Sequence, residues 1–315
     1  MRALLGSKHR MGDGPPSYAV CDLVVRSLIT LLIIFSIFSL AFILHLHHKT
    51  RKCHLLRGFN SLWPVRLLLV VSALLFSTSE LLRLSRFRRE NFYRFPILPV
   101  LSIFRHVGLC KIYIVASQGL FQPAFFITLL FLLNASLRKP DYEEHTLIRA
   151  LSLLLFSCMP LFLLQTLFVF FSERLLLWFG EKGMLIDFLR GHSHAAVKGG
   201  TNENYVLCAY PLFSTFLLAT FGALYVVCFV IVFWRTVELV INRSLRLRVY
   251  GLAFAVLSAI PAQAVCLFLS LFWDPHENAF NVLSTVAFLS VVLCAFVGEG
   301  ILVIRPILDS LAVGG

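Results

Sequence analysis

Five polar side chains stand inside long apolar segments of this chain, where a polar group is costly unless it has a partner. Gln118 and Gln122 are four residues apart and share one face of a helix, while Gln165 and Gln263 lie in later apolar segments. Glu299 stands between two glycines near the end of the last one. Because ionisable and amide groups at membrane depth often mark ligand or ion sites, these five residues are the candidate ligand-binding residues.

The four amides are expected at two matched depths. At about 1.5 Å of rise per residue, Gln118 and Gln165 both lie roughly 9 Å from the N-terminal side, and Gln122 and Gln263 lie roughly 14–15 Å from it. They could line a polar cavity for a small ligand, or they could join neighbouring helices at about 0.6 kcal/mol per pair. Glu299 could bind a cation or relay a proton, or it could simply reach headgroup water.

Other reactive residue types form weaker patterns. Glu80 lies at the end of an apolar segment beside Arg83, where a surface role is expected. His192 and His194 would fill only half of a tetrahedral metal site, so no metal is predicted. The chain contains no Gly-x-Ser-x-Gly elbow, HExxH helix or phosphate-binding loop. We therefore predict no catalytic residues, no cofactor and no enzyme activity.

The composition indicates that these residues are carried by membrane helices. The chain is 59% hydrophobic and only 14% charged, whereas soluble domains carry about 25% charged residues. The net charge of +12 comes from basic residues between the apolar runs, where they orient helices and meet anionic lipid headgroups. Membrane lipids are thus the expected partners, and nucleic acid is not.

Seven apolar runs are long enough to cross a hydrocarbon core of about 30 Å as helices. The predicted fold is an all-α polytopic transmembrane helical bundle, with a short basic segment at 1–26 and a tail at 305–315. The predicted spans are 27–46, 65–82, 112–136, 147–171, 206–234, 249–272 and 281–304.

Two connecting segments leave the number of spans open. Residues 95–110 form an apolar run of re-entrant length that contains Arg105, and an eighth span there stays possible. Residues 172–189 mix apolar clusters with charges, as in a helix that lies in the interface. With seven spans, Lys and Arg are almost equally divided between the two sides, so the orientation of the N-terminus stays open. With eight, the bias favours a cytoplasmic N-terminus.

Cysteines and glycosylation acceptors offer opposite signatures of orientation. Cys110 precedes the third span and Cys208 opens the fifth, so both fall on the N-terminal side and could form a disulfide if that side is oxidising. Asn134 and Asn242 begin Asn-x-Ser acceptors on the other side. A bridge and a glycan therefore indicate opposite orientations.

Three short segments carry a resemblance. They are Cys208-Ala209-Tyr210-Pro211-Leu212-Phe213-Ser214-Thr215, the stretch from Leu239 to Tyr250, and Ser117-Gln118-Gly119-Leu120-Phe121 with Pro123. Together they resemble a family of plant multi-pass membrane proteins of unknown function. The resemblance implies a plant source and no assigned activity.

The expected role is receptor-like or scaffolding work in the plasma membrane or an endomembrane, with a possible protein partner. The alternative is a small-solute or ion transporter that uses the glutamine cluster and Glu299. A lipid-modifying enzyme is a third class, and it would need polar groups near one interface. A receptor or scaffold should tolerate the loss of the Glu299 charge, whereas a proton-coupled carrier should not.

Overall fold

A computed structural model describes seven long apolar helical spans and a short hairpin. The described residues are 17–52, 62–81, 106–135, 146–178, 195–198, 204–207, 210–240, 242–273 and 277–313. All structural statements below refer to these residues.

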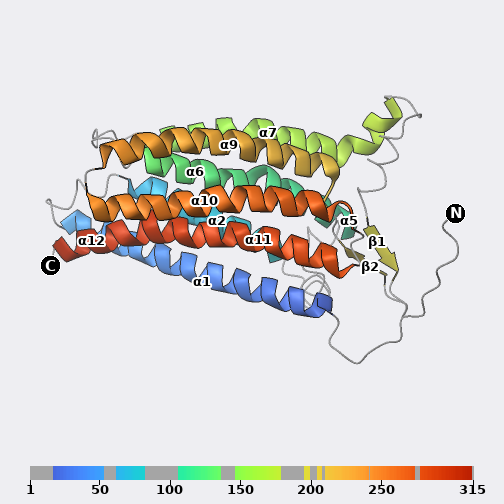
Figure 1. Cartoon of the computed structure of the whole chain (residues 1–315), viewed down its shortest axis with the longest axis horizontal. Helices are drawn as coiled ribbons and strands as arrows, with labels where there is room; N and C mark the ends of the chain where they lie inside the picture. The colour runs from blue at the N-terminus through green and yellow to red at the C-terminus, as the bar shows by residue number, and fades with distance from the viewer. Residues whose placement is uncertain are drawn as a thin grey trace.

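Seven helical spans lie side by side with their axes roughly parallel, which confirms the predicted helical bundle (Figure 1). Neighbouring spans in the chain run in opposite directions. Two spans are built from several elements, and each contains one short π-helix. The elements are α1 (Ser17–Lys52), α2 (Trp63–Leu81), α5 (His106–Ala116), η3 (Ser117–Phe121), α6 (Gln122–Ala135), α7 (Thr146–Trp178), α9 (Leu212–Leu239), α10 (Arg243–Ser270), α11 (Asn278–Glu299), η4 (Gly300–Ile304) and α12 (Arg305–Val313).

The bundle has two distinguishable ends. Helices α1, α9 and α11 begin at one end, which we call the hairpin end (Figure 1). This end also holds two antiparallel strands, β1 (Ala195–Lys198) and β2 (Asn204–Leu207). At the other, α12 ends, and we call it the α12 end. The hairpin is a small addition to the all-helical prediction. It occupies the connection between α7 and α9, outside the spans.

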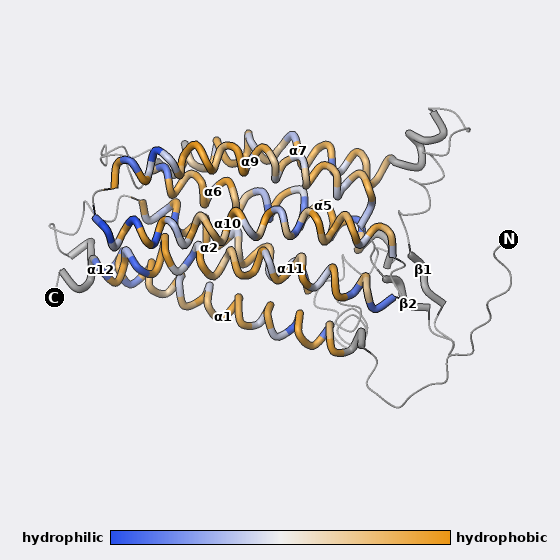
Figure 2. The backbone as a smooth tube through the Cα atoms, in the orientation of Figure 1, coloured by the Kyte–Doolittle hydropathy of each residue, from blue (hydrophilic) through white to orange (hydrophobic). Residues whose placement is uncertain are grey.

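The outside of the bundle is apolar, as lipid contact requires. Figure 2 shows hydrophobic residues along the middle of the helices and hydrophilic residues gathered toward the α12 end of α9, α10 and α12. Large side chains such as Phe156 and Phe254 are exposed on this apolar surface. Inside, the helices pack chiefly as α1 with α2 and α11, α10 with α9 and α11, and α2 with α6. Lipid therefore replaces water around a core that the helices close among themselves.

Several span boundaries differ from the prediction, and two of the differences matter most for the architecture. The fifth helix begins at Leu212 rather than at Val206, because Val206 belongs to β2 and Pro211 holds the helix N-terminus in extended backbone. The last span continues through Arg305 and reaches Asp309, so the expected tail begins as helix α12. An arginine near a span end can extend its charge to the interface, which allows the helix to continue.

The second and third spans meet at the same end of the bundle. Tyr113, near the start of the third span, donates a hydrogen bond of 2.8 Å to Glu80, near the end of the second. The connection between them therefore starts and finishes at the hairpin end, which excludes a single additional crossing. This supports seven spans over eight, although most of the 95–110 segment itself lies outside the described residues.

Candidate functional site

Gln122 and Gln263 form a reciprocal amide pair between α6 and α10. The Gln122 side chain donates to Gln263 Oε1 at 2.7 Å, and the Gln263 side chain donates back to Gln122 Oε1 at 3.0 Å. Both residues are buried. Each amide therefore satisfies a donor and an acceptor of the other, which is the arrangement expected of a joint between two helices.

Ser214 joins the other two glutamines. Its hydroxyl donates to Gln118 Oε1 at 2.7 Å, and its backbone carbonyl accepts from the Gln165 side chain at 3.3 Å. Gln165 Oε1 is buried with no hydrogen-bond partner. The structure thus groups the glutamines in the two depth-matched pairs expected from the sequence, and the second pair is held through a serine of α9.

Gln118 lies in the π-helix η3, which packs against α7 and α9. The turn at η3 is widened from Ser117 to Phe121, and π-turns of this kind often occur at functional sites. Gly119 lies within it, and a Cβ atom there would stand 3.2 Å from Gln165 Cβ. The glycine therefore allows the third and fourth spans to approach closely beside the polar groups.

A small cavity of about 10 Å³ lies beside the Gln122–Gln263 pair. Its lining includes both amides, Thr215 and Gly222 of α9, and Ile260 of α10. This volume has room for about one water molecule. Ligand binding by the glutamines stays a prediction, and any ligand larger than water would need the helices to separate.

Glu299 lies apart from the glutamines, on the contact between α11 and α1. Its side chain is 0% exposed, and Ser36 donates a hydrogen bond of 2.8 Å to its Oε1 atom. Glu299 Oε2 and the hydroxyl of Ser39 are buried without hydrogen-bond partners. Of the alternatives left open for Glu299, contact with headgroup water does not fit the structure, because α1 covers the carboxyl group.

Glu80 is also buried, which corrects its expected place at the surface. Its Oε1 atom accepts hydrogen bonds from Tyr113 at 2.8 Å and from Ser117 at 3.0 Å. The Tyr113 hydroxyl lies 3.2 Å from that of Tyr210. This network connects α2, α5, η3 and the start of the fifth span at the hairpin end.

Cys110 is disulfide-bonded. Its partner lies outside the described residues, as does Cys208, so the predicted Cys110–Cys208 pairing stays a prediction. Cys21, Cys158, Cys228, Cys266 and Cys294 are free. The two remaining cysteines are Cys53 and Cys208.

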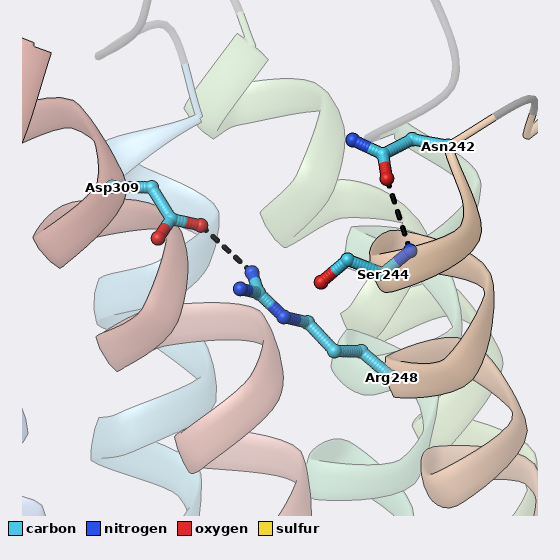
Figure 3. Close-up of polar contacts among 4 residues, drawn as sticks. All are labelled: Asn242, Ser244, Arg248 and Asp309. Atoms are coloured by element: carbon cyan, nitrogen blue, oxygen red, sulfur yellow. Dashed lines mark hydrogen bonds and ion pairs between the residues drawn. The ribbon is translucent and has the colours of Figure 1, made fainter.

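An ion pair joins α10 and α12 at the α12 end. Arg248 donates to Asp309 at 2.7 Å, and the Asn242 side chain accepts from the backbone N–H of Ser244 to cap α10 (Figure 3). Arg246 donates to the carbonyl of Val237 at the end of α9. The Asn242 cap and the Arg246 contact hold the short turn between the fifth and sixth spans, and the ion pair joins the sixth span to the last.

The functional candidates missed by sequence analysis are hydroxyl groups. Ser36 and Ser39 contribute to the Glu299 contact, Ser214 joins the glutamines, and Tyr113 binds Glu80. The sequence signal available for the Glu299 contact was the pair of serines, Ser36 and Ser39, three residues apart in the first apolar span. His192 and His194, the expected loop histidines, lie outside the described residues. Within the described residues no group of three or more His, Cys, Asp or Glu side chains could hold a metal ion.

A seven-span bundle with paired polar groups in its interior defines a polytopic helical membrane protein. The sequence profile of the family described as uncharacterised conserved protein UCP031277 matches residues 17–315. The chain belongs to that family. No curated protein matches the chain.

Proposed function

We propose that this chain is a non-enzymatic, receptor-like or scaffolding protein of the plasma membrane or an endomembrane of a plant cell. The observation that carries the proposal is the closure of the interior by cross-helix hydrogen bonds. Gln122 and Gln263 satisfy each other, and the adjoining cavity has room for about one water. A carrier would need a wider polar space, so the small-solute or ion transporter is the second candidate.

The proposed partners bind at the α12 end. There α10 begins with three arginines in its first two turns, and Arg305 and Asp309 lie on the neighbouring α12. Basic groups near a membrane surface attract anionic headgroups by about 1 kcal/mol each. The exposed apolar side chains of Leu245 and Leu247 lie among these charges and provide contact area for a protein segment.

Site-specific photocrosslinking in native membranes tests the proposal. A crosslinker at Leu247, which is 73% exposed, should capture a protein, and the Arg243→Glu variant should reduce that adduct. Phe254 is the matched control because it is 77% exposed and lies seven residues further along α10, on the same face but deeper in the membrane. It should capture lipid alone.

Two results would overturn the proposal. One is lipid capture alone at Leu247, as at Phe254. The other is solute or ion uptake by reconstituted vesicles that is lost in the Glu299→Gln variant, which would establish the transporter instead.

A further inference from the structure

Two buried oxygen atoms without hydrogen-bond partners lie on the contact between α1 and α11. They are Glu299 Oε2 and Ser39 Oγ, and both residues are 0% exposed. Ser36 lies three residues before Ser39, on the same face of α1, and donates to Glu299 Oε1. The Ser39 hydroxyl is turned toward the same carboxyl group but forms no hydrogen bond of ordinary geometry with it. The two serines and the glutamate therefore converge on one point.

This point lies inside the last span, where α1 covers Glu299 and leaves its side chain 0% exposed. Glu299 is separated from Arg305, the next charged residue along the chain, by about 9 Å of helical rise. Among the described residues, Ser36 is the hydrogen-bond partner of Glu299, and no Lys or Arg pairs with it. A lone carboxylate buried there must be neutralised or bound to a cation.

We propose that Glu299, Ser36 and Ser39 form a binding site for a monovalent cation of the sodium type. Such an ion contacts the carboxylate and the Ser39 hydroxyl together, and its single charge cancels that of the carboxylate. A water molecule would satisfy the hydroxyl but leave the charge uncompensated. A proton on Oε2 would also cancel the charge, but it would give a response to pH and none to sodium.

The composition of the site also selects against divalent ions. Calcium sites take six to eight oxygen ligands and usually several carboxylates. Glu299 is the single carboxylate at this point, and the described residues contain no group of three acidic, His or Cys ligands. The single carboxylate of Glu299 balances the charge of a monovalent cation, and the hydroxyls of Ser36 and Ser39 add neutral oxygen ligands.

The chain changes its helical pitch directly beside the site. The π-helix η4 begins at Gly300, the residue after Glu299, and Arg305 N–H bonds to Gly300 O five residues back. π-Turns interrupt the regular α-helix and often occur at functional sites. Because α1 contacts both α11 and η4, an ion at Glu299 would hold the first span against the last. The site is independent of the proposed receptor-like or scaffolding function.

Thermal unfolding of the full-length protein in lipid nanodiscs tests the site. Sodium is compared with N-methylglucamine at equal ionic strength and pH. The wild-type midpoint should rise with sodium along a one-site saturation curve, because an ion that binds only the folded state stabilises it. Glu299→Gln, whose amide can still bond to Ser36, should abolish the rise. Ser39→Ala should raise the half-saturating sodium concentration by at least about tenfold, the loss of about 1.4 kcal/mol of binding.

Ser290→Ala is the matched control, since this α11 serine is buried and bonds only within its own helix, to the Val286 carbonyl at 2.8 Å. It should keep the wild-type sodium dependence. An equal sodium response in wild type and Glu299→Gln would overturn the proposal. So would a response to pH alone, without sodium, that depends on Glu299, because the site would then bind a proton. If Glu299→Gln does not fold, an unchanged half-saturating concentration in Ser39→Ala overturns it.

Discussion

At the scale of single residues, the buried amides of Gln122 and Gln263 are matched donor to acceptor. Gln122 and Gln263 exchange two hydrogen bonds, and Ser214 connects Gln118 with Gln165. In lipid no water is available to satisfy an amide that loses its partner. The stability of the fold at this point therefore depends on the pair and not on either side chain alone.

We predict a strong coupling between Gln122 and Gln263 in a double-mutant cycle. Gln263→Leu alone leaves a buried amide unpaired and should cost about 1–3 kcal/mol, as should Gln122→Leu. The double variant replaces both partners by apolar groups and should cost less than the sum of the single variants. Equilibrium unfolding in bicelles measures all three. Additive costs would contradict the reciprocal pair.

At the scale of helices, close approach depends on small residues at the contacts. Gly222 of α9 faces Ile260 of α10, and a Cβ atom at this glycine would lie 2.9 Å from Ile260 Cγ2. That methyl is attached directly to Cβ of a β-branched side chain, which has little rotamer freedom in a helix. The neighbour cannot move away without a shift of the helix.

Gly222→Ala should therefore separate α9 from α10 and destabilise the protein by about 1–3 kcal/mol. Gly251→Ala is the control, because its Cβ would meet Ile301 Cδ1 at 3.9 Å, an ordinary contact. The control should cost nothing, since alanine favours helix by about 1 kcal/mol over glycine. Thermal unfolding in nanodiscs compares the two. Equal midpoints would show that the contact can relax.

The start of α10 depends on a side-chain cap. Asn242 accepts a hydrogen bond of 3.0 Å from Ser244 N–H at the first turn (Figure 3). Asn242→Ala should lower stability by about 1 kcal/mol, whereas Asn242→Asp should retain most of it because aspartate caps equally well. Chemical unfolding curves provide the measurement. A loss of equal size in both variants would mean that the cap contributes little.

At the scale of the whole molecule, the disulfide at Cys110 determines which end faces an oxidising compartment. Cys110 lies at the start of the third span, at the hairpin end. Strand β2 ends at Leu207, one residue before Cys208, at the same end, while α1 ends at Lys52, beside Cys53, at the α12 end (Figure 1). We therefore expect Cys208 as the partner and an N-terminal side that faces the lumen or the exterior.

Mass spectrometry of non-reduced peptides from native membranes should find Cys110 linked to Cys208, and Asn242 without a sugar. The arginines at the start of α10 then lie on the cytoplasmic side, as basic residues in short loops usually do. Cys158 and Cys294 are buried free thiols and serve as internal controls. A free thiol at Cys110 or a glycan on Asn242 would refute this orientation.

The sequence alone predicted seven spans, with an eighth left open, and the relative depths of the four glutamines. Both follow from counting residues, because helical rise is constant and hydrocarbon thickness sets the length of a span. It also predicted that the glutamines would meet at two depths. The start of the fifth span was placed too early because the apolar residues of β2 look like the beginning of a helix.

Only the tertiary structure decided which side chains face one another. A span that is apolar on nearly all sides has no polar face from which its rotation or its neighbours can be predicted. Ser36 and Glu299 are 263 residues apart in the chain, and no local pattern connects them. Glu80 was expected at the surface for the same reason, since the helices that bury it come from distant segments. The depth of a residue in the membrane can be counted along a single helix, whereas a contact depends on how two helices are rotated and placed against each other.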